Sequence, residues 1–181
     1  MDTREWKEYR IGDIFFQNRG DESAPNQNEE GEIIMINETR DNNGMTRKVE
    51  AKSIFNENAI TISINFASIV FYQPIKFCAS VNIAILRNKN LNKYNSLFLC
   101  SVLKETWKRY DYGYKISKDR INNTIILLPT TPDNQPDWQF MEDFIKKIYN
   151  KVIEEVKASA PALLSLSLSL SLSEKPPSPE M

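Results

Sequence analysis

The chain has 181 residues, with 23 lysines and arginines against 24 aspartates and glutamates, and no histidine. The length fits one ordinary domain with some chain left over, and a hydrophobic fraction of 41% is enough for a core. Without histidine, a Ser-His-Asp or Cys-His nucleophile, a zinc site built on imidazole and a histidine general base are all excluded. The near-zero net charge argues against a uniformly basic nucleic-acid-binding protein, but it leaves room for a local basic face.

The lack of a recognisable targeting signal and the setting of the two cysteines predict a reducing compartment. The segment 1–6 lacks the apolar core of a signal peptide, and no run of about 18 apolar residues is present that would span a membrane. Cys78 and Cys100 lie in apolar segments without Cys-x-x-Cys spacing. We therefore expect a cytoplasmic protein with buried free thiols and no membrane association.

The first third of the chain predicts short strands separated by turns. Residues 6–16 mix aromatic and aliphatic side chains and indicate a strand followed by a helical turn. Residues 17–32 are polar and rich in turn formers, which predicts a long surface loop. A strand is expected over 32–36, and the Asp-Asn-Asn-Gly sequence at 41–44 is a strong turn signal because Asn and Gly tolerate positive φ.

The middle of the chain predicts more strands and one helix. Residues 59–64 alternate apolar and polar side chains, as a half-buried strand does. Strands are also expected over 68–73, 81–86 and 124–128, and proline follows the first and the last of them. Apolar residues at helical spacing over 94–107 indicate an amphipathic helix.

A long helix is expected to begin after Asp137, which can act as its N-cap. Its apolar stripe is close to heptad spacing and consists of Met141, Phe144, Ile145, Ile148, Val152 and Val156. Two interpretations fit this stripe: a coiled-coil seam with a second helix, or a helix docked on its own domain. We expect a domain over 1–137 and the start of a spacer or dimerisation helix over 138–157.

The remaining segment, 158–181, differs from the rest of the chain in composition. It holds five unbroken Leu-Ser pairs over 164–173 and then a proline-rich end. This composition predicts a disordered low-complexity tail. A run of CT dinucleotides encodes Leu-Ser in every frame, so the tract is also typical of a slippage site that shifts the reading frame. On that interpretation the end is out-of-frame sequence without selected structure.

Catalytic and cofactor motifs are scarce. The five glycines are never within seven residues of one another, which excludes a phosphate-binding loop, a dinucleotide fingerprint and the usual S-adenosylmethionine loop. One weak pattern remains: Asp41 with Glu50 and Lys52 has the acid, Glu-x-Lys spacing of a Mg²⁺-dependent nuclease. Solvated charges after a turn explain it more simply, and we favour that explanation. We expect no catalytic residue, no bound metal and no cofactor.

The basic charge is concentrated in one segment. Residues 87–120 carry nine basic and three acidic groups, and 104–120 interleaves basic with aromatic side chains. Lys and Arg neutralise phosphates, and Tyr hydrogen-bonds phosphates or stacks on bases. The alternative is a solvated basic loop whose tyrosines cover the core. The candidate DNA-binding residues here are Lys104, Lys108, Arg109, Tyr110, Tyr112, Tyr114, Lys115, Lys118 and Arg120.

A second candidate segment surrounds the turn at 41–44. Asn and Arg are the side chains best matched to adenine and guanine edges in the major groove. An ordinary polar hairpin turn is the competing explanation. The candidate residues are Arg40, Asn42, Asn43, Arg47 and Lys48.

The order of short motifs resembles a target-recognition domain from the DNA specificity subunits of type I restriction–modification systems, and from related type IIB subunits. The resemblance covers about residues 4–157. The matching residues are Trp6, Tyr9, Ile11 to Phe15, Asn43-Gly44, Phe55, Asn58, Ile60-Thr61, Phe71 to Gln73, Phe77, Ala79 to Asn82, Tyr112, Tyr114, Arg120-Ile121, Ile125, Leu127 to Pro129, Pro136 to Trp138 and Met141.

The resemblance implies a mixed α/β fold with a curved, largely antiparallel or mixed sheet and packed helices. It implies a non-catalytic protein that reads one half of a split duplex DNA target. A following helix would pack as a coiled coil on the equivalent helix of a second half or a second copy, with a methyltransferase subunit docked beside it. The methyltransferase would hold S-adenosylmethionine, and the nuclease would reside elsewhere.

The chain departs from that family pattern in one respect. A full specificity subunit has two recognition domains and two long helices, whereas this sequence has one domain and the start of one helix. Two explanations fit: a half-subunit that dimerises, or an inactive truncated product of a phase-variable gene with a frame-shifted tract.

Overall fold

The computed structural model describes residues 5–108 and 116–173, with side chains described as far as residue 159. The chain forms two compact units, Met1–Ile145 and Lys146–Met181. The first unit extends beyond the boundary predicted at residue 137. The elements, in chain order, are β1 (Trp6–Arg10), α1 (Ile11–Ile14), β2 (Phe16–Arg19), η1 (Pro25–Gln27), β3 (Glu30–Ile36), η2 (Asn42–Gly44), β4 (Met45–Val49), β5 (Ala59–Ser63), β6 (Val70–Gln73), β7 (Cys78–Ala79), β8 (Ile83–Arg87), α2 (Lys93–Trp107), α3 (Lys118–Asn123), β9 (Ile125–Pro129) and α4 (Trp138–Ser173).

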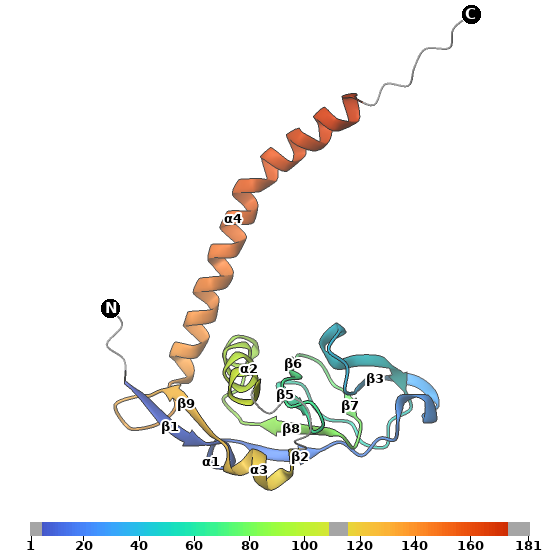
Figure 1. Cartoon of the computed structure of the whole chain (residues 1–181), viewed down its shortest axis with the longest axis vertical. Coiled ribbons are helices and arrows are strands. Elements are labelled where there is room, and N and C mark those ends of the chain that lie inside the picture. Colours follow the sequence, from blue (N-terminus) through green and yellow to red (C-terminus); the bar gives the residue numbers. More distant parts are fainter. Residues whose placement is uncertain (1–4, 109–115, 174–181) are drawn as a thin grey trace, which may run out of the picture. The chain divides into compact units, whose positions relative to one another are not determined.

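The centre of the first unit is an antiparallel four-stranded sheet in the order β2-β8-β5-β6. One face carries Ile60, Ile62 and Leu86 against the core under α2, and Figure 1 shows α2 lying over this sheet. The opposite face carries Ala59 and Ile85 in a second apolar cluster. Both faces of the central strands β5 and β8 are therefore buried.

Strand β5 is buried along its whole length, so the prediction of a half-buried strand is wrong. The polar positions in the alternation also lie inside the fold, because each finds a hydrogen-bond partner there. The Thr61 hydroxyl donates to the Phe71 carbonyl at 3.3 Å, and the Ser63 hydroxyl donates to a carboxylate oxygen of Glu38 at 2.6 Å. In β5, the polar residues of the alternating pattern are therefore side chains that form hydrogen bonds inside the fold, and not side chains that face solvent.

A three-stranded sheet in the order β4-β3-β7 supplies the second cluster on the far face, with β3 and β7 parallel and β3 and β4 antiparallel. Glu38, just after β3, ties this sheet to the central one. Its carboxylate accepts hydrogen bonds from Ser63, from the backbone and side chain of Asn65, and from Asn82. The mixed α/β fold with antiparallel and mixed sheets is confirmed.

Three strands and one helix were not predicted. The surface loop expected over 17–32 is wrong at its start, because β2 pairs there with β8 in the register Gln17↔Leu86 and Arg19↔Ala84. After Phe16 the side chains of β2 are polar, so the strand has no apolar period. At its end Gly20 approaches the backbone so closely that a Cβ would lie 2.2 Å from the Ser80 carbonyl oxygen. The other missed elements are β4, β7 and α3.

The first turns of α4 belong to the core of the first unit. Asp137 caps the helix as predicted, since its Oδ1 accepts from the Phe140 amide at 2.9 Å. Met141 is 0% exposed and Ile145 packs on the same cluster. These two residues therefore do not belong to a partner seam, and docking on the chain's own domain is the correct interpretation for them. The pair β1–β9 completes this end of the core.

The second unit is the continuation of α4. The helix runs to Ser173, so the disorder predicted for residues 158–173 is wrong. Leu and Ala favour helix, and a helix satisfies its own backbone hydrogen bonds without a partner strand. Pro161 lacks an amide hydrogen, so the helix loses one hydrogen bond at that residue. Residues 174–181 of the predicted tail lie outside the described residues.

Candidate nucleic-acid interface

The turn between β3 and β4 is built from asparagines in the left-handed region. Asn42 and Asn43 have φ of 47° and 56°, and Gly44 follows at 80°. The Asn43 amide nitrogen donates to the Tyr72 carbonyl at 2.8 Å and to Gln73 Oε1 at 3.3 Å. Asn43 was predicted to read bases; its amide is instead used to hold the turn against β6. Asn42 is exposed.

The cations of this turn and its strand face solvent. Arg40 precedes the turn, and Arg47 and Lys48 lie on β4; all three side chains are exposed. Lys48 lies 3.5 Å from a carboxylate oxygen of Glu32 on β3. An exposed ion pair of this kind contributes about 0–1 kcal/mol, so Lys48 can exchange this carboxylate for another anion at little cost.

The last two turns of α2 present the second group of cations. The Lys104 ammonium lies 4.9 Å from the centre of the Phe71 ring on β6. Lys108 pairs with Glu105 at 3.6 Å one turn earlier, again between exposed side chains. The predicted residues Arg109, Tyr110, Tyr112, Tyr114 and Lys115 lie outside the described residues.

The fold brings these two candidate segments to one place. Phe71 is touched by Lys104 from α2, and its ring lies 3.4 Å from where a Cβ on Gly44 would be. The turn is also hydrogen-bonded to the next residues of β6 through Asn43. The turn after β3 and the end of α2, which are distant in sequence, therefore border the same strand.

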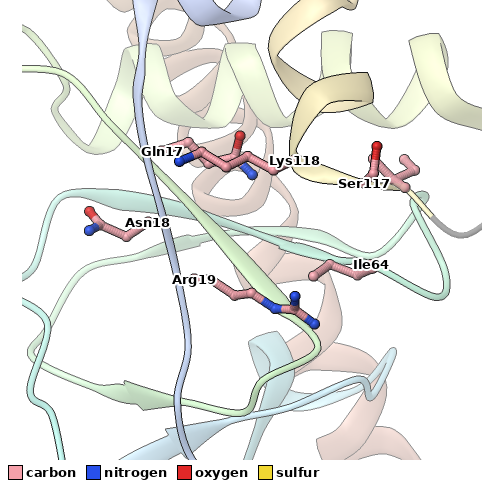
Figure 2. A pocket seen from close by; sticks show the side chains of 7 residues that line it. Gln17, Asn18, Arg19, Ile64, Ser117 and Lys118 are labelled. Atoms are coloured by element: carbon pink, nitrogen blue, oxygen red, sulfur yellow. The ribbon is translucent and has the colours of Figure 1, made fainter.

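The remaining predicted cations lie on α3. Ser117 caps this short helix by accepting a hydrogen bond from the Arg120 amide at 3.2 Å, and Lys118 and Arg120 are exposed. Figure 2 shows Lys118 at a surface pocket together with Gln17, Asn18 and Arg19 from β2. The sequence did not identify the β2 residues as site residues, because the segment was expected to be a loop. The run of Gln, Asn and Arg side chains was the signal that could have identified them.

The nuclease alternative is not supported by the geometry. Asp41 and Glu50 flank β4, whose five residues span about 16 Å at 3.3 Å per residue. The Lys52 backbone amide donates to Glu22 at 2.6 Å, which directs that segment toward a different carboxylate. Over residues 5–108 and 116–173, no group of three or more Cys, Asp or Glu side chains is arranged to hold a metal ion. The predicted acid and Glu-x-Lys residues are therefore separate surface charges.

Comparison with known families decides the class of the chain. The family model described as the type I restriction modification DNA specificity domain matches residues 3–158. The chain belongs to this family. Membership in the family places this specificity domain among DNA-recognition components and not among catalytic subunits.

Two curated proteins are similar to the specificity domain. It is 34% identical over 153 residues to the specificity subunit S.BcgI of the type II restriction enzyme BgcI from Heyndrickxia coagulans, covering 82% of this chain and 45% of that protein. It is 33% identical over 105 residues to a protein from Mycoplasma pneumoniae described as a type I specificity subunit, covering 56% and 34%.

Solved structures share the fold at low identity. The HsdS subunit from Thermoanaerobacter tengcongensis matches with a TM-score of 0.59 at 16% identity, covering 87% of this chain and 40% of that one. The type I S subunit from M. genitalium matches with a TM-score of 0.58 at 16% identity, covering 98% and 47%. The specificity domain spans less than half the length of each of these relatives.

One finding bears on the membrane. Within the described ranges, no helix combines the length and the apolar character that crossing a bilayer requires.

Proposed function

We propose that this specificity domain binds duplex DNA in the cytoplasm and directs partner subunits of a restriction–modification system to one half of a target site. The observation that carries the proposal is that two segments meet at β6, around Phe71. One is the turn after β3, with Arg40 and Asn42, and the other is the end of α2, with Lys104. Cations from separate segments of one surface are what a phosphate backbone requires.

The exposed side of α4 beyond the first unit is proposed to bind a second helix. In the second unit Ile148 and Val152 are exposed, and Val156 has 62% of its surface exposed. These three residues are spaced four apart and so share one side of the helix. Lys151 and Glu155, each next to one of them in sequence, form an ion pair at 3.9 Å. An apolar stripe flanked by charges is the pattern of a coiled-coil seam. Its partner would be the helix of a second recognition half or of a second copy.

A methyltransferase subunit is the other proposed partner. The family match and the solved S subunits, which belong to multi-subunit systems by their descriptions, support this assignment. The specificity domain would then supply the recognition of DNA, and S-adenosylmethionine chemistry would take place on the partner.

Salt-dependent DNA binding by the full chain, with and without the co-expressed methyltransferase subunit, tests the proposal. Fluorescence anisotropy with a labelled duplex should show an affinity that falls as salt rises, with a slope of about −0.9 per phosphate contact. Replacing both Arg47 and Lys104 by alanine should make the slope shallower by up to about 2. Lys89→Ala, an exposed cation before α2, is the matched control and should leave the slope unchanged.

Absence of binding in every combination, even at low salt, would reject a DNA-reading role. Failure to co-purify with the methyltransferase subunit would instead support the alternative that the chain is an inactive truncated product of a phase-variable gene. Mg²⁺-dependent cleavage by the purified chain would revive the nuclease alternative, with Glu50→Ala as its test.

A further inference from the structure

A surface pocket of about 320 Å³ lies between β2 and the segment that leads into α3. Figure 2 shows its polar walls: Gln17, Asn18 and Arg19 come from β2, and Ser117 and Lys118 come from the start of α3. Ile64 and Ile116 form the apolar part of the lining, held together by a hydrogen bond from the Ile116 amide to the Ile64 carbonyl at 2.9 Å. A pocket of this size is at the low end of the range for small ligands, about 300 to 1,000 Å³.

One wall of the pocket contains a buried polar group without a partner. Gln17 is 9% exposed, and its carboxamide oxygen is buried with no hydrogen-bond partner in the described residues. Buried polar atoms are almost always hydrogen-bonded, so the unpartnered carboxamide oxygen of Gln17, beside a pocket, is a candidate for a bond that a ligand supplies. A carboxamide pairs with groups that place a donor beside an acceptor, as the edge of a nucleobase does.

Two cations meet the same pocket. The Arg19 Nε donates to the Val81 carbonyl oxygen, which fixes the guanidinium and leaves its two terminal nitrogens for a ligand. The Lys118 ammonium has no ion pair with the described residues, and no residue in the pocket lining is acidic. A fixed guanidinium and an ammonium together are suited to a phosphate.

We propose that this pocket binds one nucleotide unit, with the base on the Gln17 carboxamide and the phosphate held by Arg19 and Lys118. The apolar surface of Ile64 and Ile116 would cover part of the base. Phosphate alone would leave Gln17 unpartnered, and an intact duplex does not fit a cavity of this volume. Two sources have this chemistry: a nucleotide extruded from DNA, which rests on the proposed function, and a free nucleotide, which does not.

Calorimetric titration of the full chain with deoxynucleoside monophosphates and with deoxyribose 5-phosphate tests the assignment. Nucleotides should bind at least tenfold more tightly than the base-free sugar phosphate. Gln17→Met keeps the size of the side chain but removes the carboxamide, and it should abolish that preference. Lys118→Ala should weaken every phosphate-bearing ligand about tenfold. Lys89→Ala, an exposed cation outside the pocket lining and outside the candidate DNA-binding residues, is the control.

A duplex that carries 2-aminopurine distinguishes the two sources, since its fluorescence rises when the base is unstacked. A rise on binding that is lost in Gln17→Met assigns the pocket to extruded DNA. Mononucleotide binding without that rise assigns it to a free nucleotide, and this outcome holds even if the chain fails to bind duplex DNA. If neither mononucleotide binding nor a fluorescence rise occurs, or if deoxyribose 5-phosphate binds as tightly as the nucleotides, the proposal is wrong. Lys118 is exposed, so Lys118→Ala should leave the fold intact, and the test therefore does not depend on the buried Gln17 variant.

Discussion

Met141 and Val152 occupy the same predicted stripe of α4 but have different surroundings, and this contrast gives a sharp prediction. Met141 is 0% exposed in the core of the first unit, whereas Val152 is 50% exposed. Met141→Ala removes a fully buried side chain and should lower the free energy of unfolding by about 2–5 kcal/mol. Val152→Ala loses little burial and gains helix propensity, so it should change stability by less than about 0.5 kcal/mol.

Urea denaturation followed by tryptophan fluorescence measures both effects, because Trp107 is buried and reports on the first unit. With a slope of about 2 kcal/mol/M, a loss of 3 kcal/mol lowers the midpoint by about 1.5 M for Met141→Ala. The midpoint for Val152→Ala should match that of the unmodified chain at low protein concentration. Equal midpoint losses for the two variants would refute the division of the stripe into a core part and an exposed part.

Four further predictions concern the first unit. Gly20→Ala should lower stability by about 1–3 kcal/mol in the same assay, because a Cβ there meets backbone oxygens, and Gly12→Ala, whose nearest contact would be at 3.1 Å, should cost less. Asn43→Ala should cost about 1–3 kcal/mol of stability and leave the salt slope of DNA binding unchanged, in contrast to Arg47→Ala. Burial raises the pKa of the Cys78 and Cys100 thiols from 9.0 to about 12, so neither should react with a thiol reagent at pH 8 until the chain unfolds. Because both pKa values are raised in the fold, their contribution to stability should be complete below pH 9 and decline toward pH 12, as pH-dependent melting would show.

Elements with a strong apolar signature could be predicted from the sequence, and elements held by polar contacts could not. The apolar runs over 81–86 and 124–128 correspond to β8 and β9, and the spacing over 94–107 corresponds to α2. Strand β2 was missed because Gln17 and its neighbours carry no hydrophobic period, and its strand character comes from pairing with β8. Register across a sheet is a tertiary property, which a single segment does not encode.

The candidate site was predictable by residue type but not by role. Sequence composition identified Lys104 and the turn around Asn43, and the structure places both against β6. It could not show that the Asn43 amide is turned inward, since that depends on where the Tyr72 carbonyl lies. It also could not identify Gln17 and Arg19 as pocket residues while their strand was unrecognised.

The helical state of the Leu-Ser tract has a geometric consequence for any change in the number of its pairs. Each residue of an α-helix adds about 1.5 Å and 100° of rotation. One extra Leu-Ser pair would therefore lengthen α4 by about 3 Å and turn everything after it by about 200°, whereas two extra pairs would add about 6 Å and turn it by about 40°. In a helix that carries a dipeptide repeat, adding one pair thus nearly reverses the direction in which the distal end faces, whereas adding two pairs turns it by only about 40°.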